Sequence, residues 1–379
     1  MIRALWEMPD AAAWTGGLNY FRNLAQALAS LPERAVEPVL AGVSDNLPEP
    51  LRRLPSVPTY SAPPAGSWSP RGIRVRLERR WRGADRDYDR YLRRHGIGLL
   101  SHLAVPAGKT EVPLLAWIPD FQHRHLLQLF SKKIVDWRTN RHAWLAEIAQ
   151  GIMLSSEDAR RDFNRFHPCY EEKAPVLRFV AIPPSPADLP SLEGVLEKHG
   201  IAEPYFHIPN QIWAHKNHGI VLKALDLLRR RGRPCPLVVS TGQTDDYRHP
   251  DYFRQLSRQV GEAGLEERYR FLGLVDYSEA CALMRGAVAL VNPSLFEGWS
   301  TTVEEAKSLG KRMILSSLAV HREQAHDRSS FFDPQDADQL ARLMEEALAA
   351  YDPAQEARAM QAAGDALPGR IREYGRMYE

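Results

Sequence analysis

Short apolar runs alternate with segments of helical periodicity along the second half of the chain. From residue 202 onward, the runs are bounded by glycine, proline or polar clusters, which is typical of buried strands that end in turns. The predicted strands are residues 205–209, 237–240, 269–273, 287–292, 313–316 and 331–333. The helices predicted between them are residues 218–231, 250–263, 278–285, 302–309 and 336–350. This alternation predicts a doubly wound α/β domain with a parallel sheet.

The first half repeats this pattern less regularly, with strands predicted at residues 2–5, 38–41, 98–103, 114–118, 151–155 and 177–181. Four prolines in residues 182–190 predict an extended connector between the halves. We therefore predict an N-terminal Rossmann-like domain at residues 1–183, a Pro-rich linker at 184–203 and a C-terminal Rossmann-like domain at 204–355. The tail, residues 356–379, is a candidate to cross back to the first domain. Two such domains face each other across a cleft, and ligands bind where parallel strands end.

Composition narrows the class of protein. A chain of 379 residues that is 44% hydrophobic and 25% charged is typical of packed globular domains, and a net charge of +2 gives no general reason to expect nucleic acid. Three distant cysteines, Cys169, Cys235 and Cys281, fit neither a disulfide framework nor a zinc site. Acidic residues at Glu7 and Asp10 argue against a secretory signal, and no apolar run is long enough to span a membrane. We expect a cytoplasmic protein, and the excess of arginine over lysine is typical of a bacterial genome.

The segment 291–310 carries the most informative pattern. It reads as a buried strand, a short loop and a helix, so the loop lies where ligands of parallel sheets bind. The free amides and the positive dipole end of such a helix suit a phosphate or diphosphate. Glu297 precedes the helix and Glu305 lies a turn inside it, so the two carboxylates could grip a sugar and a ribose on either side of the diphosphate. The predicted phosphate-binding residues are Gly298, Trp299, Ser300, Thr301 and Thr302.

The same spacing has a purely structural interpretation. Thr301 with Glu304, and Thr302 with Glu305, each match a capping box, in which the glutamate only stabilises the start of the helix. Spacing alone leaves the two interpretations equally open.

Glu-Gly-Trp-Ser-Thr-Thr-Val-Glu-Glu, from Glu297 to Glu305, resembles the Glu-x7-Glu signature of family 4 retaining glycosyltransferases, which have the two-domain GT-B fold. The resemblance implies that Glu297 contacts the donor sugar and that Glu305 contacts the ribose of the nucleotide. It also implies a retaining reaction with no metal and no cofactor, in which a nucleotide diphosphate sugar is the co-substrate. The resemblance further implies that the N-terminal domain binds the acceptor and that the C-terminal domain binds the nucleotide sugar.

The resemblance extends to the first predicted strand-to-helix loop. The segment 14–24 is similar to the family's loop whose glycines face the donor, which implies that role for Gly16 and Gly17. No Gly-x-Gly-x-x-Gly pattern follows the first strand, which argues against a dinucleotide oxidoreductase.

Lys216 follows the first strand of the second domain, where family members carry an arginine and a lysine five residues apart that neutralise the diphosphate. Gln211 stands at the arginine position, so this position carries no positive charge in this sequence. A lone lysine at the start of a helix is ordinarily solvated, so only the resemblance favours Lys216 as the diphosphate cation.

Two further segments are weaker matches. Residues 113–125 include the end of a predicted strand, where the family often has the sequence His-Asp. Asp120 matches the aspartate, but Pro119 replaces the histidine. His123 could supply an imidazole instead. His123 and His125 lack a third ligand at a suitable spacing, so a surface pair is favoured over a metal site. Leu274 falls in a segment that resembles the one whose backbone reads the nucleotide base.

Residues 71–94 combine many arginines with apolar residues at helical spacing, which predicts one basic amphipathic helix. Such a helix can lie on an anionic membrane or meet a lipid-diphosphate or acidic saccharide. The alternative, an arginine-rich helix packed by its apolar stripe, is favoured on spacing alone. The Asp87-Tyr-Asp89 pattern inside this helix is not expected to bind metal.

We predict a bacterial retaining hexosyltransferase that moves a sugar from a nucleotide diphosphate sugar to a saccharide or a lipid-linked saccharide, in surface polysaccharide or glycoconjugate synthesis. Peripheral contact with the inner face of the membrane through the basic helix is part of this hypothesis. Two alternatives remain open, a GT-B epimerase acting on the same type of donor and a catalytically silent sugar-nucleotide-binding scaffold.

Overall fold

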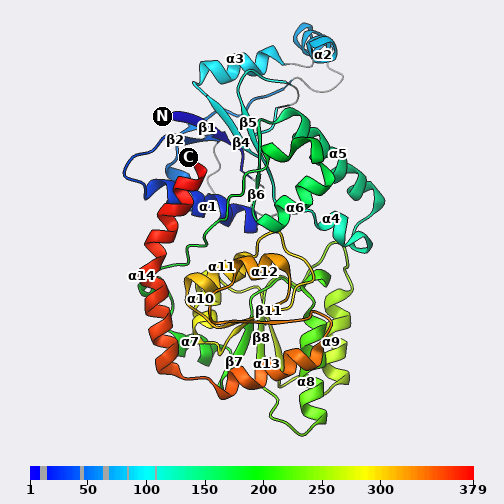
Figure 1. The fold of residues 1–379 in the computed structure, drawn as a ribbon, viewed down its shortest axis with the longest axis vertical. Coiled ribbons are helices and arrows are strands. Elements are labelled where there is room, and N and C mark those ends of the chain that lie inside the picture. The colour runs from blue at the N-terminus through cyan, green and yellow to red at the C-terminus, as the bar shows by residue number, and fades with distance from the viewer. Residues whose placement is uncertain (9–14, 43–46, 63–67, 83–84, 107–108) are drawn as a thin grey trace. The chain divides into compact units, whose positions relative to one another are not determined.

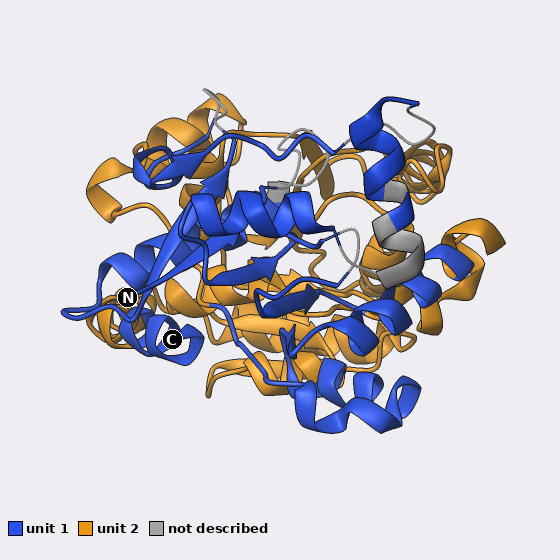
Figure 2. Ribbon diagram, turned by 90° about the horizontal axis from the view of Figure 1, so that it is seen from above, with its two compact units in different colours: residues 1–120, 136–179, 370–379 blue, residues 121–135, 180–369 orange. Residues whose placement is uncertain are grey.

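The computed structural model describes the chain apart from residues 9–14, 43–46, 63–67, 83–84 and 107–108 (Figure 1). The chain forms two compact units, drawn in different colours in Figure 2. Unit 1 comprises residues 1–120, 136–179 and 370–379, and unit 2 comprises residues 121–135 and 180–369.

Unit 1 is built on a parallel sheet with the strand order β3-β2-β1-β4-β5-β6. The strands are β1 (Ile2–Trp6), β2 (Val36–Ala41), β3 (Ser56–Val57), β4 (Leu99–His102), β5 (Leu114–Ile118) and β6 (Gly151–Leu154). The helices are α1 (Thr15–Ala29), α2 (Pro70–Arg82), α3 (Arg86–Arg94), α5 (Lys132–Ile148), whose first turn belongs to unit 2, and α6 (Glu157–Phe166). The order along the sheet reverses between β1 and β4, which lie side by side with Ala4 opposite Leu99.

Unit 2 repeats this architecture with the strand order β12-β11-β10-β7-β8-β9. The strands are β7 (Tyr205–Ile208), β8 (Leu237–Thr241), β9 (Tyr269–Gly273), β10 (Leu290–Asn292), β11 (Met313–Ser316) and β12 (Ser329–Phe332). The helices are α4 (Gln122–His125), α7 (Leu192–Lys198), α8 (His218–Arg230), α9 (Tyr252–Glu262), α10 (Tyr277–Gly286), α11 (Thr301–Ser308), α12 (Ala319–Gln324), α13 (Ala337–Ala349) and most of α14 (Pro353–Tyr378). The strand pairs of both units are parallel, so the predicted pair of doubly wound α/β domains is confirmed.

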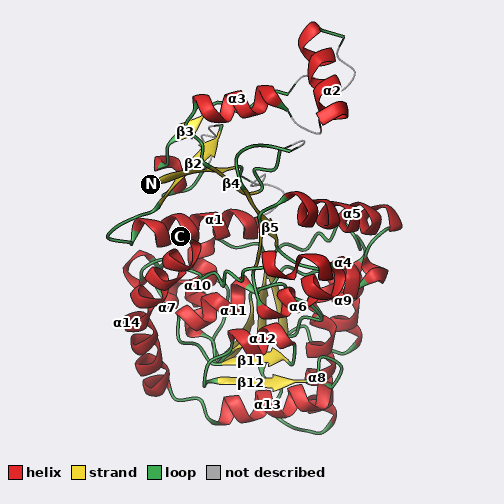
Figure 3. Cartoon of the chain, turned by 45° about the horizontal axis from the view of Figure 1, so that its top comes forward, coloured by secondary structure: helices red, strands yellow, loops and turns green. Residues whose placement is uncertain are grey.

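The core of unit 2 forms because its strands are apolar on both faces, as expected for a parallel sheet covered by helices. One face packs Val238, Val291 and Ile314 against α8, α9 and α13. The other face packs Leu290 and Leu315 against α10 and α11. Figure 3 shows β11 and β12 lying between helices α12 and α13. The strands therefore hold a rigid edge from which the loops of the site project.

The end of helix α14 belongs to unit 1, where Tyr378 is buried beside the first strand. Trp6 Nε1 donates to Tyr378 Oη at 2.9 Å, and the Tyr378 and Ser101 hydroxyls are hydrogen-bonded at 2.8 Å. Residues 370–379 of the predicted tail thus pack within the N-terminal unit.

Two predicted elements are wrong. Residues 177–181 are not a strand: Leu177 and Phe179 are buried, but only a single bridge joins Leu154 to Val176. Burial of an apolar run does not require a ladder of hydrogen bonds. Residues 71–94 form two helices and not one, because Asp85 caps the start of α3 by accepting from the amides of Asp87 and Tyr88.

The boundaries also differ from the predicted ones. Within the predicted linker 184–203, helix α7 buries Val195 in a cluster with Ile201 and Tyr205 of unit 2. This segment is therefore part of unit 2 and not a spacer. Strand β3, with two residues, has no counterpart among the predicted strands.

Candidate functional site

The strand order of unit 2 reverses between β7 and β10, and the loops that follow these two strands lie side by side at their carboxyl ends. Open α/β sheets bind ligands at such a reversal. The Leu295 amide donates to the His215 carbonyl at 2.8 Å, which joins the two loops directly. Asn217, in the left-handed conformation with φ 57°, donates through Nδ2 to the carbonyls of Pro293 and Pro334. These bonds hold the loops in a fixed relation.

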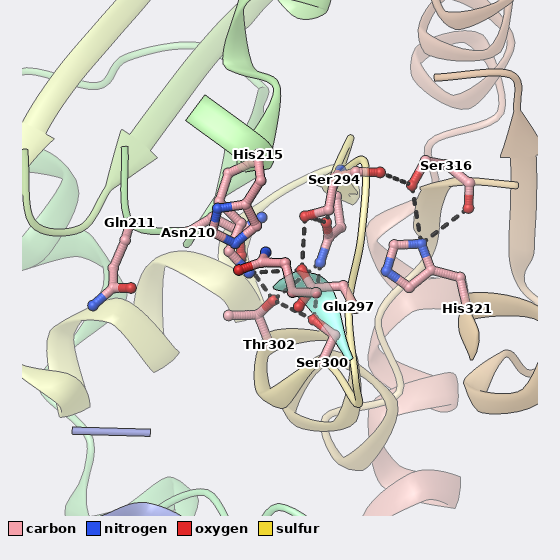
Figure 4. A network of polar contacts seen from close by, with 12 residues as sticks. Asn210, Gln211, His215, Ser294, Glu297, Ser300, Thr302, Ser316 and His321 are labelled. Carbon is pink, nitrogen blue, oxygen red and sulfur yellow. Dashed lines mark hydrogen bonds and ion pairs between the residues drawn. The ribbon is translucent and has the colours of Figure 1, made fainter. Parts of the chain in front are cut away.

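Lys216 and Glu297 meet across this reversal. Lys216 Nζ lies 2.6 Å from Glu297 Oε1, and the Ser294 hydroxyl lies 2.7 Å from the same oxygen (Figure 4). Within the described part of the chain, no hydrogen bond holds the second carboxylate oxygen. The side chains of Lys216 and Glu297 are 15% and 10% exposed. The pair is thus shielded but open to a ligand at one carboxylate oxygen and at the remaining ammonium protons.

The surroundings keep Glu297 ionised. Burial raises its pKa, but the charge of Lys216 and the hydrogen bonds from Lys216 and Ser294 lower it, and the resulting pKa lies below its ordinary value. His321 is fully buried, and burial lowers its pKa. Its Nδ1 donates to the Ser316 carbonyl at 2.9 Å, which leaves Nε2 as an acceptor with no partner among the described residues. The site therefore combines one cation, one anion and a neutral imidazole.

The start of helix α11 excludes the two predicted capping boxes. The N-cap is Ser300, and its side chain makes no capping bond. The Thr302 hydroxyl donates instead to Asn210 Oδ1 at 3.0 Å, and Asn292 Nδ2 donates to the Ser300 hydroxyl at 2.9 Å. The N-cap is thus Ser300, while Thr301 and Thr302 lie inside the helix, so neither threonine is the N-cap that the predicted capping boxes with Glu304 and Glu305 require.

Not all of the predicted phosphate-binding residues offer an amide. The Ser300 amide donates to Gln324 Oε1 at 3.0 Å, so this amide is engaged within the protein. Trp299 is buried at 9% exposure. Gly298 precedes the helix, and Thr301 and Thr302 lie in its first turn, where amides have no intrahelical acceptor.

Glu305 lies in the middle of α11 and is 6% exposed, and Glu304 is 1% exposed. Glu304 Oε1 lies 3.9 Å from Lys307 Nζ. Leu274, after β9, is 81% exposed on the same unit. The structure places Glu305 one turn beyond the Glu297 loop, as the spacing indicated.

Gln211 does not join the cluster around Glu297. Its side chain lies apart from that cluster in Figure 4, and its carbonyl lies 3.2 Å from His218 Nε2. The backbone there packs against Gly242, where an added Cβ would lie 2.6 Å from the Asn210 carbonyl oxygen. Gly242 has φ +140°, so this close approach requires glycine.

Arg248 is a buried cation of unit 2 that the sequence analysis missed. It lies 3.2 Å from Asp246 Oδ1 and 3.1 Å from His215 Nδ1, and its guanidinium stacks 4.9 Å from the Trp213 ring centre. Arg248 therefore contacts the loop that holds Lys216 through its hydrogen bond with His215. Its isolated position in a polar loop gave no sequence signal.

The remaining predicted site residues lie on other elements. Asp120 is in unit 1, where Arg138 donates to its Oδ1 at 2.7 Å, whereas His123 is buried in α4 of unit 2. Gly16 and Gly17 lie in the first turn of α1, directly after residues outside the described part of the chain. His123 is 1% exposed, so the expectation of a surface histidine pair is wrong for this residue.

The described residues include neither a metal-binding cluster nor a membrane-spanning helix. No cluster of three or more His, Cys, Asp or Glu side chains could hold a metal ion. No described helix combines the length and the apolar character needed to cross a bilayer.

Comparison with known proteins relates the chain to sugar-transferring enzymes. Residues 197–364 match the family described as glycosyl transferases group 1. The O-antigen chain mannosyltransferase RfbU of Salmonella typhimurium is 28% identical over 134 residues, and the match spans 35% of each protein.

Solved structures of low sequence identity share the fold over the whole chain. Anabaena HepE, solved in complex with UDP and glucose, is 16% identical with a TM-score of 0.71, and the match covers 100% of this chain and 98% of HepE. WaaG, described as a glycosyltransferase involved in lipopolysaccharide biosynthesis, is 16% identical with a TM-score of 0.57 and coverages of 99% and 95%.

Proposed function

We propose that the chain transfers a hexosyl unit from a nucleotide diphosphate sugar to a saccharide or lipid-linked saccharide, with retention of configuration and without a metal. The match of residues 197–364 to the family described as glycosyl transferases group 1 supports a sugar transferase. The observation that carries this proposal is the Lys216–Glu297 pair at the strand reversal of unit 2, next to the start of helix α11. The lipopolysaccharide and O-antigen roles of WaaG and RfbU support synthesis of a bacterial surface glycan in the cytoplasm.

The donor side of the proposal rests on complementary charge. A diphosphate is anionic, and the first-turn amides of Thr301 and Thr302, together with the positive end of the α11 dipole, favour an anion. Lys216 has ammonium protons beyond the one directed at Glu297, and it supplies the positive charge. The UDP found in the HepE structure supports a nucleotide ligand of this kind.

Glu297 is suited to a sugar hydroxyl. One carboxylate oxygen is held by Lys216 and Ser294, so the side chain is fixed, and the other oxygen is available as an acceptor. Glu305 lies further along α11, where it would meet the ribose. A fixed acceptor orients the donor sugar without an entropy cost at the moment of reaction.

In the proposed reaction, the bond between the anomeric carbon and the phosphate oxygen breaks and the acceptor hydroxyl attacks from the same face. The departing phosphate oxygen accepts the proton of that hydroxyl, so no protein nucleophile is needed. The task of Lys216 and the α11 amides is to stabilise the negative charge on the leaving diphosphate.

The proposal is tested by a thermal-shift screen with UDP, GDP, ADP, dTDP and their common sugars, because a ligand that binds only the folded state raises the melting temperature. We expect a shift with one nucleotide and loss of that shift, or of transfer, in Glu297→Ala. No shift with any nucleotide in a folded sample would contradict a donor site. Binding without transfer over an acceptor panel would favour the scaffold, and conversion of the donor without an acceptor would favour the epimerase.

We also propose that helix α2 contacts an anionic membrane surface near the acceptor. Two described arginines of α2 pair with Asp87 of α3: Arg71 Nε lies 3.0 Å from Oδ2, and Arg74 Nη2 lies 2.5 Å from Oδ1. Asp87 therefore neutralises part of the positive charge of α2. Charge reversal at Arg79, Arg80 and Arg82 should reduce co-sedimentation with anionic liposomes. Equal co-sedimentation of variant and wild type would show that the helix is only a packed surface helix.

A further inference from the structure

Unit 1 has a cavity of about 200 Å³ at the reversal point of its own sheet. Its lining includes Glu7, directly after β1, and Ala104, Val105 and Pro106, shortly after β4. These are the two strands between which the strand order reverses. The position is therefore the one at which an open parallel sheet binds a ligand.

Three tyrosines form one wall of this cavity. The ring centres of Tyr60 and Tyr88 are 4.9 Å apart, those of Tyr60 and Tyr91 are 5.4 Å apart, and the rings of Tyr88 and Tyr91 are nearly parallel at 11°. The Tyr91 hydroxyl donates to the Pro58 carbonyl at 2.6 Å, which fixes that ring. The wall is thus aromatic, and the Tyr60 and Tyr91 rings are fixed by the hydrogen bonds of their hydroxyls.

Two carboxylates complete the lining. Asp85 is held in place because it caps α3 and accepts from the Tyr60 hydroxyl at 3.2 Å. Glu7 makes no hydrogen bond to any described residue; burial raises its pKa, while the charge of Arg141 opposes the shift. No lysine, arginine or histidine is among the described residues that line the cavity. Arg71, near Tyr60, is paired with Asp87.

We propose that this cavity binds one uncharged pyranose ring, the terminal sugar of the acceptor. The proposal rests on the proposed function, which requires a saccharide acceptor. A volume of about 200 Å³ is below the roughly 300–1,000 Å³ of sites for drug-sized ligands, so it limits the occupant to about one ring.

The chemistry of the lining selects the class of sugar. Pyranose rings have apolar faces of C–H groups that pack on aromatic rings, and hydroxyls that donate to carboxylates. The two carboxylates of the lining repel a uronic acid or a phosphate, because the described lining residues include no cation that would contact the ligand's negative charge. The ring bound here is therefore a neutral hexose and not an acidic one.

The test measures saturation-transfer NMR between the full chain and four methyl glycosides: the α-glucoside, the α-mannoside, the α-galactoside and the α-glucuronide. The glucoside and the glucuronide differ only by the charged carboxylate. We expect saturation transfer to at least one neutral glycoside. The glucuronide should bind about tenfold more weakly than the glucoside, and this difference in affinity should be smaller in Glu7→Gln. A tenfold ratio corresponds to about 1.4 kcal/mol.

Variants locate the binding. Tyr88→Ala should lose the neutral glycoside signal, and Trp137→Ala should keep it, because Trp137 is an exposed ring of unit 1 outside the cavity. A folded Tyr88→Ala protein that binds as the wild type does would overturn the proposal, as would the absence of transfer to any neutral glycoside. If Tyr88→Ala does not fold, Glu7→Gln provides the test instead. The proposal is overturned if Glu7→Gln leaves the ratio of glucoside affinity to glucuronide affinity unchanged.

Nucleotide binding separates this inference from the proposed function. The thermal shift caused by a nucleotide should be the same in Glu7→Gln and in the wild type, because Glu7 lies in unit 1 whereas Lys216, Thr301 and Thr302, which are proposed to bind the diphosphate, lie in unit 2. If a nucleotide binds and no glycoside does, the cavity proposal alone fails. If glycosides bind and no nucleotide does, the proposed transferase function fails instead.

Discussion

Lys216→Met tests whether the Lys216–Glu297 pair is both a structural and a functional unit. The substitution keeps most of the alkyl stem and removes the charge, so the Glu297 carboxylate, 10% exposed, loses its cation. It retains only the Ser294 hydroxyl at 2.7 Å as a described hydrogen-bond donor. We expect a folded protein that is destabilised and that transfers sugar much more slowly.

The size of the effect follows from burial. Removing one partner of a buried ion pair costs about 3–5 kcal/mol, and the remaining exposure and the Ser294 bond favour the lower end, about 3 kcal/mol. For a domain of roughly 150–250 residues this lowers the melting temperature by about 6–12 °C. Loss of one charge stabiliser of the leaving group reduces the transfer rate by about 10²–10³.

The pH dependence identifies the cause. In the wild type the pKa of Glu297 is lowered, so the pair contributes stability above the unfolded value of 4.5 and loses it as the pH falls through the folded pKa. In Lys216→Met, burial then dominates and raises the pKa of Glu297. The stability gap between the two proteins should be largest at pH 7 and should close toward pH 4, where the buried carboxylate is protonated.

The double variant Lys216→Met/Glu297→Gln separates stability from chemistry. It removes the unpaired charge, so most of the lost melting temperature should return, while transfer stays much slower than in the wild type. Calorimetry from pH 4 to 7 and a donor-consumption assay measure both. A single variant with the wild-type melting temperature, or a double variant as unstable as the single one, would refute this reasoning.

Three further predictions concern the scaffold. Gly242→Ala should destabilise unit 2 by at least about 1–3 kcal/mol in denaturant titration, because φ is +140° and the new Cβ would clash with the Asn210 carbonyl; an unchanged midpoint would contradict this. Asn217→Ala should cost about 2–3 kcal/mol through two lost hydrogen bonds and the left-handed backbone, and Asn217→Gly should recover part of that loss. Burial lowers the pKa of His102 to about 3, so unit 1 should lose up to about 1.4 kcal/mol per pH unit below pH 6.5, and His102→Gln should flatten that slope.

The strands of the sheets were largely predictable because buried apolar runs ended at glycine, proline or polar clusters. Residues 114–118, 269–273 and 313–316 were predicted with the bounds that β5, β9 and β11 have. Residues 177–181 have the same apolar character but pair with no neighbouring strand, since only tertiary packing decides whether a buried run joins a ladder. The break between α2 and α3 depends on one aspartate cap, which the arginine-rich periodicity concealed.

The candidate site was predictable in its loops but not in its contacts. The sequence placed Lys216 after the first strand of the second domain and Glu297 in a loop that follows another strand of the same sheet, and parallel strands end at one edge. Their pairing joins residues 81 apart in sequence, a distance at which no local pattern acts. The bond from the Ser300 amide to Gln324 likewise depends on the placement of α12, and it removes one amide from the predicted phosphate site.

In the proposed function, Glu297 has two tasks that compete. As the partner of Lys216 it stays ionised and fixed, but the same contact neutralises the cation that a diphosphate requires. The geometry resolves this because the contact uses one carboxylate oxygen and one ammonium proton, at 2.6 Å. The second oxygen is then an oriented acceptor for a sugar hydroxyl, and the other ammonium protons are oriented donors for phosphate. Loss of either residue would disorder the other, so the two functions are coupled in one pair of side chains.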